Sequence, residues 1–254
     1  MKRIILSALG LLTLSGAYAQ LKPEKMTPES SELWDPEPRL VTPGTLTGNL
    51  LGTTAPSDAL VLFDGSGLDQ WVSSEDAKSP APFTVKDGAM TVAPKKGGIQ
   101  TRQEFGDFQL HIEWRSPSEV KGSGQGRGNS GIFLQGIYEL QVLDSYNNRT
   151  YANGQAGSIY KQTPPLVNPV KAPGEWQSYD VIYTAPRFNK DGMVTVPAYV
   201  TVLLNGVVVQ LHTQIQGTTP YVGRPINKPH GKGPISLQDH GDLVSFRNIW
   251  IREL

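Results

Sequence analysis

Short runs rich in β-branched and aromatic residues alternate with clusters of Gly, Pro, Asp and Asn from residue 59 onward. This pattern is typical of short strands separated by turns. No long stretch has a helical period of apolar residues, and no internal repeat is found. The runs predict strands at residues 59–63, 83–85, 89–92, 108–114, 132–142, 179–183, 199–204, 207–210 and 244–251.

Two of the turns are specified by their residue types. Asn205-Gly206 separates two apolar runs, which is the strongest short-range signal of a hairpin. Lys86-Asp87-Gly88 lies between Val85 and Met90 and predicts a second hairpin. The chain's 27 glycines and 20 prolines punctuate the other runs. Many short strands joined by such turns predict an all-β sandwich or barrel.

The first 19 residues have the organisation of a secretory signal peptide. Lys2 and Arg3 form a basic start, residues 4–14 form an apolar stretch, and residues 17–19 form an A-x-A cleavage site. A buried N-terminal helix would not need these features in this order. We therefore expect cleavage after Ala19 and a periplasmic or secreted protein. Because the chain has no cysteine, it is expected to carry neither a lipoprotein anchor nor disulfides.

Residues 20–57 are expected to form an extended arm ahead of a single domain at 58–254. Six prolines fall in the arm with few large apolar residues, and such a segment cannot sustain a helix or a central strand. Two interpretations stay open. Either Leu33 and Trp34 attach the arm to the domain surface, or the arm is a flexible linker.

The charge pattern excludes several kinds of partner. The chain has 23 basic and 23 acidic residues and no block of like charge. Nucleic acid and anionic membrane surfaces both need a clustered basic surface, so neither is expected as a partner. No stretch after the signal peptide is apolar enough to span a membrane. Four scattered histidines and the absence of cysteine predict no metal site, and no cofactor is expected.

A glycine-rich loop covers residues 122–132. Its G-x-G-x-x-G string is followed by a strand, so it is not a dinucleotide fingerprint, which needs a helix at that place. Ser130 lacks the G-x-S-x-G elbow of a serine hydrolase. We expect the loop to bring Asn129 and Ser130 to a strand end as substrate-binding residues, with an ordinary surface loop as the alternative.

The run at 138–144 carries polar side chains at alternate positions. Strand alternation places Glu139 and Gln141 on one face, and a bulge at the strand end would turn Asp144 to the same side. Burying a carboxylate without partners is costly, so such a face usually lines a cleft. The alternative is a sheet surface that faces water.

Three consecutive polar residues, Gln238, Asp239 and His240, end a short predicted strand near the C-terminus. Histidine is the side chain best able to act as a base near neutral pH, and a neighbouring carboxylate such as Asp239 would raise its pKa. A turn histidine without a catalytic role is the alternative.

Arg247 lies in the last predicted strand, on the expected face of Ile249 and Ile251. Its guanidinium could bind a substrate oxygen or clamp a carboxylate. A structural ion pair with an acid on the neighbouring strand is the equally supported alternative.

Several aromatic residues are candidates for stacking on sugar rings: Trp71, Trp176, Tyr160 and Tyr221. Aromatic residues belong more often to a core than to a ligand platform. Tyr160 and the adjacent Lys161 are kept as substrate-binding candidates.

The motifs together resemble the 3-keto-disaccharide hydrolase domain family over residues 58–254. The resemblance is carried by LFDG-x-x-L-x-x-W (62–71), F-x-L-x-x-E-W-R (108–115), NSGIF (129–133), YELQVLD (138–144), GEWQ-x-YD (174–180), LNGV (204–207), LQDHG (237–241) and FRNIW (246–250). It implies a concanavalin A-like jelly-roll sandwich of two antiparallel sheets. It also implies that the polar candidates, Arg247 included, line a concave sugar-binding face and act on glycosides oxidised at C3.

The chemistry of such a substrate suggests roles for these residues. A ketone at C3 acidifies the C2 hydrogen, so a base can remove it, the aglycone can leave from C1, and water can add across the double bond. We expect His240 as the base, oriented by Asp239, and Glu139 as the acid, although these two could be exchanged. Asn129, Gln141, Gln238 and Arg247 are candidate hydrogen-bond donors.

Two other functions stay open on the sequence. A conventional glycoside hydrolase on a laminarinase-like jelly roll would pair Glu139 with Asp144. A carbohydrate-binding module without activity would need aromatic residues on the concave face.

Overall fold

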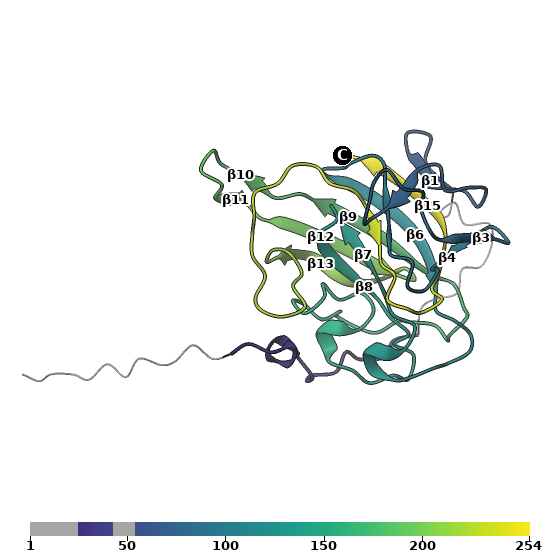
Figure 1. Ribbon diagram of the computed structural model, residues 1–254. Helices are drawn as coiled ribbons and strands as arrows, with labels where there is room; N and C mark the ends of the chain where they lie inside the picture. The colour runs from purple at the N-terminus through teal and green to yellow at the C-terminus, as the bar shows by residue number, and fades with distance from the viewer. Residues whose placement is uncertain (1–24, 43–53) are drawn as a thin grey trace, which may run out of the picture.

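The computed structural model describes residues 25–42 and 54–254 as a sandwich of two antiparallel sheets (Figure 1). This confirms the predicted all-β jelly-roll fold. The predicted signal peptide and parts of the arm, at 20–24 and 43–53, lie outside the described residues. No helix in the described part is long and apolar enough to cross a membrane.

The larger sheet has eight strands. Its order is β13 (Val207–Ile215), β12 (Ala198–Leu204), β9 (Gln177–Thr184), β6 (Phe108–Arg115), β15 (Ser245–Glu253), β4 (Ala89–Thr91) and β3 (Thr84–Lys86), and β1 (Leu60–Phe63) also pairs with β15.

The smaller sheet has five strands, in the order β2 (Trp71–Ser73), β5 (Ile99–Thr101), β14 (Ser236–Leu237), β7 (Ser130–Leu134) and β8 (Tyr138–Val142). A separate ribbon joins β10 (Arg187–Phe188) to β11 (Val194–Val196), and three 3-10 turns complete the elements: η1 (Pro28–Ser31), η2 (Gly124–Gly126) and η3 (Ala152–Gly154).

The core lies between the two sheets and takes alternate residues from each strand. Ile112 and Trp114 of β6 face Ile132 of β7 and Leu140 of β8 across one continuous apolar cluster, and all four side chains are fully buried. Because strand side chains alternate, the residues between them point outward. The sites of interest are therefore on the two outer faces of the sandwich.

Two of the observed turns were predicted from the sequence, and a third was not. Asn205-Gly206 and Asp87-Gly88 both have the paired positive φ values of a type I′ turn, at 53° with 77° and 52° with 73°. The run at 132–142 is not one strand. Gln135-Gly136 forms another such turn, at 52° and 72°, and splits the run into β7 and β8.

The strand β8 is the last strand of the small sheet, and residues 157–160 cover its free edge. The backbone of Gln141 donates to Ser158 O and accepts from Gly157 N, and Tyr160 N donates to Glu139 O. This segment supplies the backbone partners that a further strand would have given.

The described part of the arm contacts the domain. Leu33 N donates to Asn153 Oδ1 at 2.9 Å, and the Trp34 ring packs edge-on against Tyr151 with centroids 6.0 Å apart. Further along, Val41 N donates to Asn168 O. Of the two interpretations of the arm, the structure supports attachment through Leu33 and Trp34.

Candidate active site

Glu139 lies on β8 with its side chain on the outer face of the five-stranded sheet. Its pair on β7 is Phe133, and Gly131 faces Gln141 two pairs further along, on the same face. A Cβ atom at Gly131 would come within 2.6 Å of Glu139 Oε1. The missing side chain at Gly131 therefore provides the space that the carboxyl group occupies.

A chain of amides fixes the side chain next to Glu139. Gln125 Nε2 donates to Gly154 O at 2.8 Å, and Asn129 Nδ2 donates to Gln125 O at 2.7 Å. Backbone carbonyl oxygens only accept hydrogen bonds. Each of these two amide groups therefore has its nitrogen toward the carbonyl and its side-chain oxygen on the opposite side. Those oxygens face one end of the Gln141 amide at 3.1 and 3.4 Å.

The other end of the Gln141 amide points at Glu139. It lies 3.3 Å from Glu139 Oε1 and 3.2 Å from the carbonyl oxygen of Ser130, and with the nitrogen at this end it donates to both. Burial raises the pKa of Glu139 to about 8. This pKa favours the neutral carboxylic acid at pH 7, and the residue is 6% exposed.

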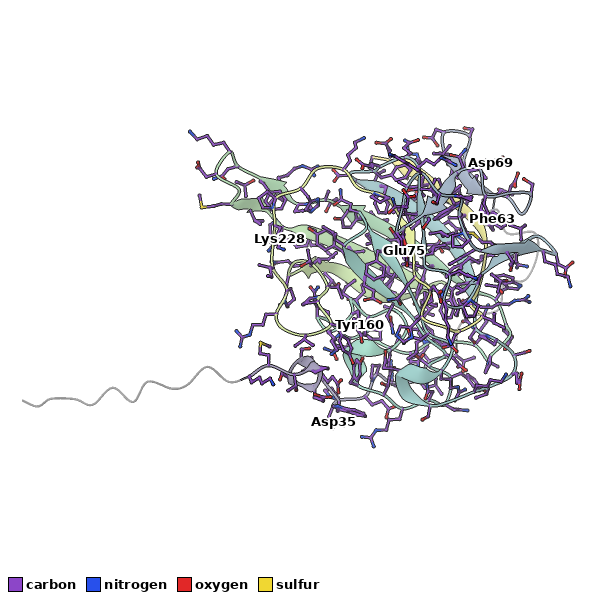
Figure 2. All side chains as sticks on the ribbon, in the orientation of Figure 1. Asp35, Phe63, Asp69, Glu75, Tyr160 and Lys228 are labelled. Carbon is purple, nitrogen blue, oxygen red and sulfur yellow. The ribbon has the colours of Figure 1, made fainter. Side chains whose placement is uncertain are left out.

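The segment that covers the edge of β8 brings tyrosines to this site. Tyr160 N donates to Glu139 O, and the hydroxyl groups of Tyr160 and Tyr151 are 2.6 Å apart. Burial raises the pKa of Tyr160, so both hydroxyl groups stay protonated. Figure 2 shows Tyr160 and the arm residue Asp35 on the same lower side of the domain.

Lys161 does not take the substrate-facing position expected for it. Its side chain is 3% exposed, and Nζ donates to Pro28 O at 2.6 Å and to Tyr221 O at 3.0 Å. Glu32 of the arm lies 4.0 Å from the same ammonium group. Lys161 therefore joins the arm to the loop at Tyr221.

The C-terminal candidates lie beyond the end of β14, on the other side of β8. Gln238 N donates to Gly131 O, which places this segment beside the glycine under Glu139. Asp239 does not orient His240, because its carboxylate accepts the backbone N–H groups of Lys96, Gly97 and Gly241.

His240 is exposed, and neither it nor the Gln238 side chain has a hydrogen-bond partner among the described residues. Asp239 fixes the loop that carries His240, and these two side chains stay available to a ligand.

Three other candidates serve the framework. Ser130 Oγ donates to Gln238 O at 2.8 Å, and Asn129 N donates to Asp242 at 2.8 Å. Asp144 forms a buried ion pair with Arg127 at 2.7 Å, next to a cavity of about 250 Å³ at one end of the sandwich. The Asp144 carboxylate is thus engaged away from Glu139, which counts against a two-carboxylate pair.

Arg247 lies on the outer face of the other sheet. Its Nε contacts Glu113 Oε2 at 2.6 Å, and its guanidinium lies 4.1 Å from the centroid of the Trp176 ring. A bulge between Arg247 and Trp250 shifts the alternation, so Arg247 does not share a face with Ile249 and Ile251. The ion-pair interpretation describes this residue, and Arg247 lies on a different sheet from Glu139.

The other three aromatic candidates differ in exposure and in location. Trp71 is 1% exposed and belongs to the core, where its Nε1 donates to Leu62 O. Trp176 lies with Arg247 on the larger sheet, and Tyr221 is exposed beside Lys161.

Gln125, Tyr151 and Asn153 were not predicted from the sequence. Gln125 stands between two glycines in the same loop as Asn129 and Ser130. A polar side chain in such a loop was the available signal. Over residues 25–42 and 54–254, no three His, Cys, Asp or Glu side chains are grouped in a way that could hold a metal ion.

The fold and the site define a jelly-roll β-sandwich protein with a buried acid on one outer face. Residues 58–252 match the sequence model of the 3-keto-alpha-glucoside-1,2-lyase-like domain, and the chain belongs to this family.

Individual relatives agree with this assignment. A Bacteroides thetaiotaomicron protein named 3-keto-disaccharide hydrolase is 27% identical over 241 residues, which cover 78% of this chain and 80% of that protein. The crystal structure of a candidate glycosyl hydrolase from Parabacteroides distasonis is 57% identical, with a TM-score of 0.78 over 90% of this chain and 97% of the other. A second one from that organism, 21% identical with a TM-score of 0.55 over 78% and 94%, shares the fold. These relatives support a carbohydrate-active hydrolase.

Proposed function

We propose that the protein is an exported enzyme that cleaves 3-keto-glycosides by elimination and hydration. The observation that carries the proposal is the buried carboxyl of Glu139, whose pKa burial raises to about 8. An acid that stays protonated at neutral pH can protonate a leaving alkoxide, and its position on an outer sheet face makes it reachable. The family and the name of the B. thetaiotaomicron relative supply the substrate class.

The two proton transfers of the reaction are assigned to His240 and to Glu139, which approach the substrate from different sides. His240 accepts the C2 proton, and the C–H electron pair moves toward the C3 carbonyl to give an enolate. The enolate collapses to a C1–C2 double bond as the C1–O bond breaks, and Glu139 donates its proton to the departing oxygen. Water then adds its hydroxyl to C1 and gives its proton to the Glu139 carboxylate, and the protonated His240, after exchange with solvent, returns a proton to C2, which gives net hydrolysis. Gln238 and Tyr160 can donate hydrogen bonds to substrate oxygens, whereas Asn129 and Gln141 are engaged with their neighbours.

The test is to incubate the purified protein in D₂O with a methyl glucoside and with its 3-keto derivative and to follow both by NMR. We expect turnover of the keto derivative alone, with deuterium at C2 of the released sugar. The variants His240→Gln and Glu139→Gln should each lower kcat by about 10²- to 10⁴-fold. Turnover of the unoxidised glucoside at a similar rate, or full activity in both variants, would reject the proposal.

Export rests on the residue pattern at 1–19. The native protein should begin at Gln20 and fractionate with periplasmic or secreted proteins. Recovery of native protein that still starts at Met1 would contradict this.

A further inference from the structure

Two buried side chains of the domain bind the arm. Asn153 is fully buried, and its amide accepts from Leu33 N and donates to Ser31 O, both at 2.9 Å. Lys161 is almost as buried and donates to Pro28 O of the arm as well as to Tyr221 O of the domain. Buried polar groups are nearly always paired, and without the arm the Asn153 amide would lose both of its partners and Lys161 one of its two. The segment at 28–34 is therefore a built part of the domain surface.

Trp34 is held in one orientation by this segment although it remains exposed. Its Nε1 donates to Glu32 Oε2 at 3.2 Å, and its ring meets Tyr151 edge-on at an interplanar angle of 71°. Even so, 48% of the residue is open to solvent. A large aromatic surface that is oriented but uncovered is suited to stacking on a ligand.

Trp34 continues a row of aromatic rings that begins beside Glu139. The centroids of Tyr160 and Tyr151 are 6.2 Å apart, and those of Tyr151 and Trp34 are 6.0 Å apart. The row extends from the free edge of β8, whereas β14 and His240 lie on the other side of this strand. If His240 contacts the keto ring and Glu139 contacts the glycosidic oxygen, the leaving group extends toward Tyr160 and beyond it.

We propose that Trp34 forms a subsite that stacks on a pyranose ring of the leaving group, with Glu32 as the residue that orients the indole. The direction of this subsite rests on the proposed function. The arm would thus set the preference of the enzyme for oligosaccharides over glycosides with a small aglycone.

The experiment compares the wild type with Trp34→Ala, Trp34→Phe and the control Trp176→Ala, which removes a tryptophan from the other sheet. The substrates are methyl 3-keto-glucosides of both anomers and maltotriose and cellotriose oxidised at C3 of the non-reducing ring. We expect Trp34→Ala to raise KM for the trisaccharide by about 3- to 10-fold at unchanged kcat. KM for the methyl glycoside should stay the same, Trp34→Phe should recover part of the loss, and the control should match the wild type.

An equal change of KM for both kinds of substrate, or no change for the trisaccharide, would overturn the subsite. Unfolding midpoints of the variants separate a local effect from a general loss of structure. If the wild type turns over neither kind of substrate, the proposed function fails. The subsite is then judged by titrating unoxidised maltotriose and cellotriose: weaker binding to Trp34→Ala than to the control supports it, and equal or absent binding overturns it.

Discussion

The side-chain amide of Gln141 lies 3.3 Å from Oε1 of Glu139, and the side-chain oxygens of Gln125 and Asn129 face its other end at 3.1 and 3.4 Å. This hydrogen-bond network positions the carboxyl group of Glu139, while burial raises its pKa. The following predictions test this network and the elements around it.

The free energy of unfolding should fall with rising pH because of Glu139. The pKa of its carboxyl is about 8 in the folded protein, against about 4.3 in an unfolded chain. Between these values the folded state holds a proton that the unfolded state has lost, so stability declines from about pH 4 to about pH 8 and then levels off. Denaturant unfolding of wild type and Glu139→Gln at several pH values measures this. The variant should lack this decline, and parallel curves would contradict the assignment.

Activity should fall on the alkaline side for the same reason. A general acid must be protonated in the free enzyme, so kcat/KM should decrease above about pH 8. Initial rates at low substrate concentration between pH 6 and 10 give the profile. A rate that still rises above pH 9 would show that Glu139 is needed as an anion.

Replacing Gly131 by alanine should displace the acid. The new Cβ would lie 2.6 Å from Glu139 Oε1 and 3.1 Å from the Phe133 ring. We expect a loss of about 1–3 kcal/mol in stability and a decrease of about 10- to 100-fold in kcat. Gly126→Ala is the matched control, because no atom lies within 4 Å of its added Cβ. Equal activity of the two variants would mean that the position of Glu139 is not critical.

Asn153→Ala should release the arm. The substitution leaves the backbone groups of Leu33 and Ser31 without their partner, at a cost of about 1–3 kcal/mol. Trypsin should then cut faster after Arg39, whose carbonyl oxygen accepts from Asn168 N in the attached arm. Asn189→Ala, in the turn between β10 and β11, is the control and should be cut at the wild-type rate. Unchanged cleavage of the Asn153 variant would argue that the arm is held by other contacts.

Arg247→Met should affect stability more than activity. The substitution leaves Glu113 with Asn248 and His111 as its polar neighbours, while the apolar stem still covers Trp176. Because the guanidinium is 42% exposed, the expected loss is only about 1 kcal/mol. The value of kcat/KM should stay within about twofold of the wild type, since no interaction of Arg247 reaches the small sheet. A large loss of activity at unchanged stability would return Arg247 to the active site.

The sequence predicts those parts of the fold that are locally encoded. The strands β6, β9 and β12 have long apolar runs and were found, and Asn205-Gly206 defines its own turn. The strands β2, β5 and β14 have two or three residues each and depend on their neighbours in the sheet rather than on their own sequence. The turn at Gln135-Gly136 was hidden because apolar residues flank it on both sides.

The candidate site likewise has parts that the sequence predicts and parts that it does not. The outward alternation of Glu139 and Gln141 follows from strand geometry and was predictable. The pairing of Gln141 with Gln125 spans 16 residues and that of Asn153 with Leu33 spans 120, so neither has a local signal. The face of Arg247 depends on a bulge at Asn248, where φ is 47°, and one irregular residue reverses the alternation beyond it.

The last strand of the chain, β15, lies in the interior of the large sheet and pairs with β6 on one edge and with β4 and β1 on the other. The domain therefore closes only when its final residues meet its first strand. While the polypeptide is being synthesised, the edges of β6 and β1 have no partner, and long-range pairing of this kind is slow. Folding of the domain has to wait until β15 has been synthesised. Proteolysis that removes only β15 would leave β6 on one side, and β4 and β1 on the other, with unpaired edges.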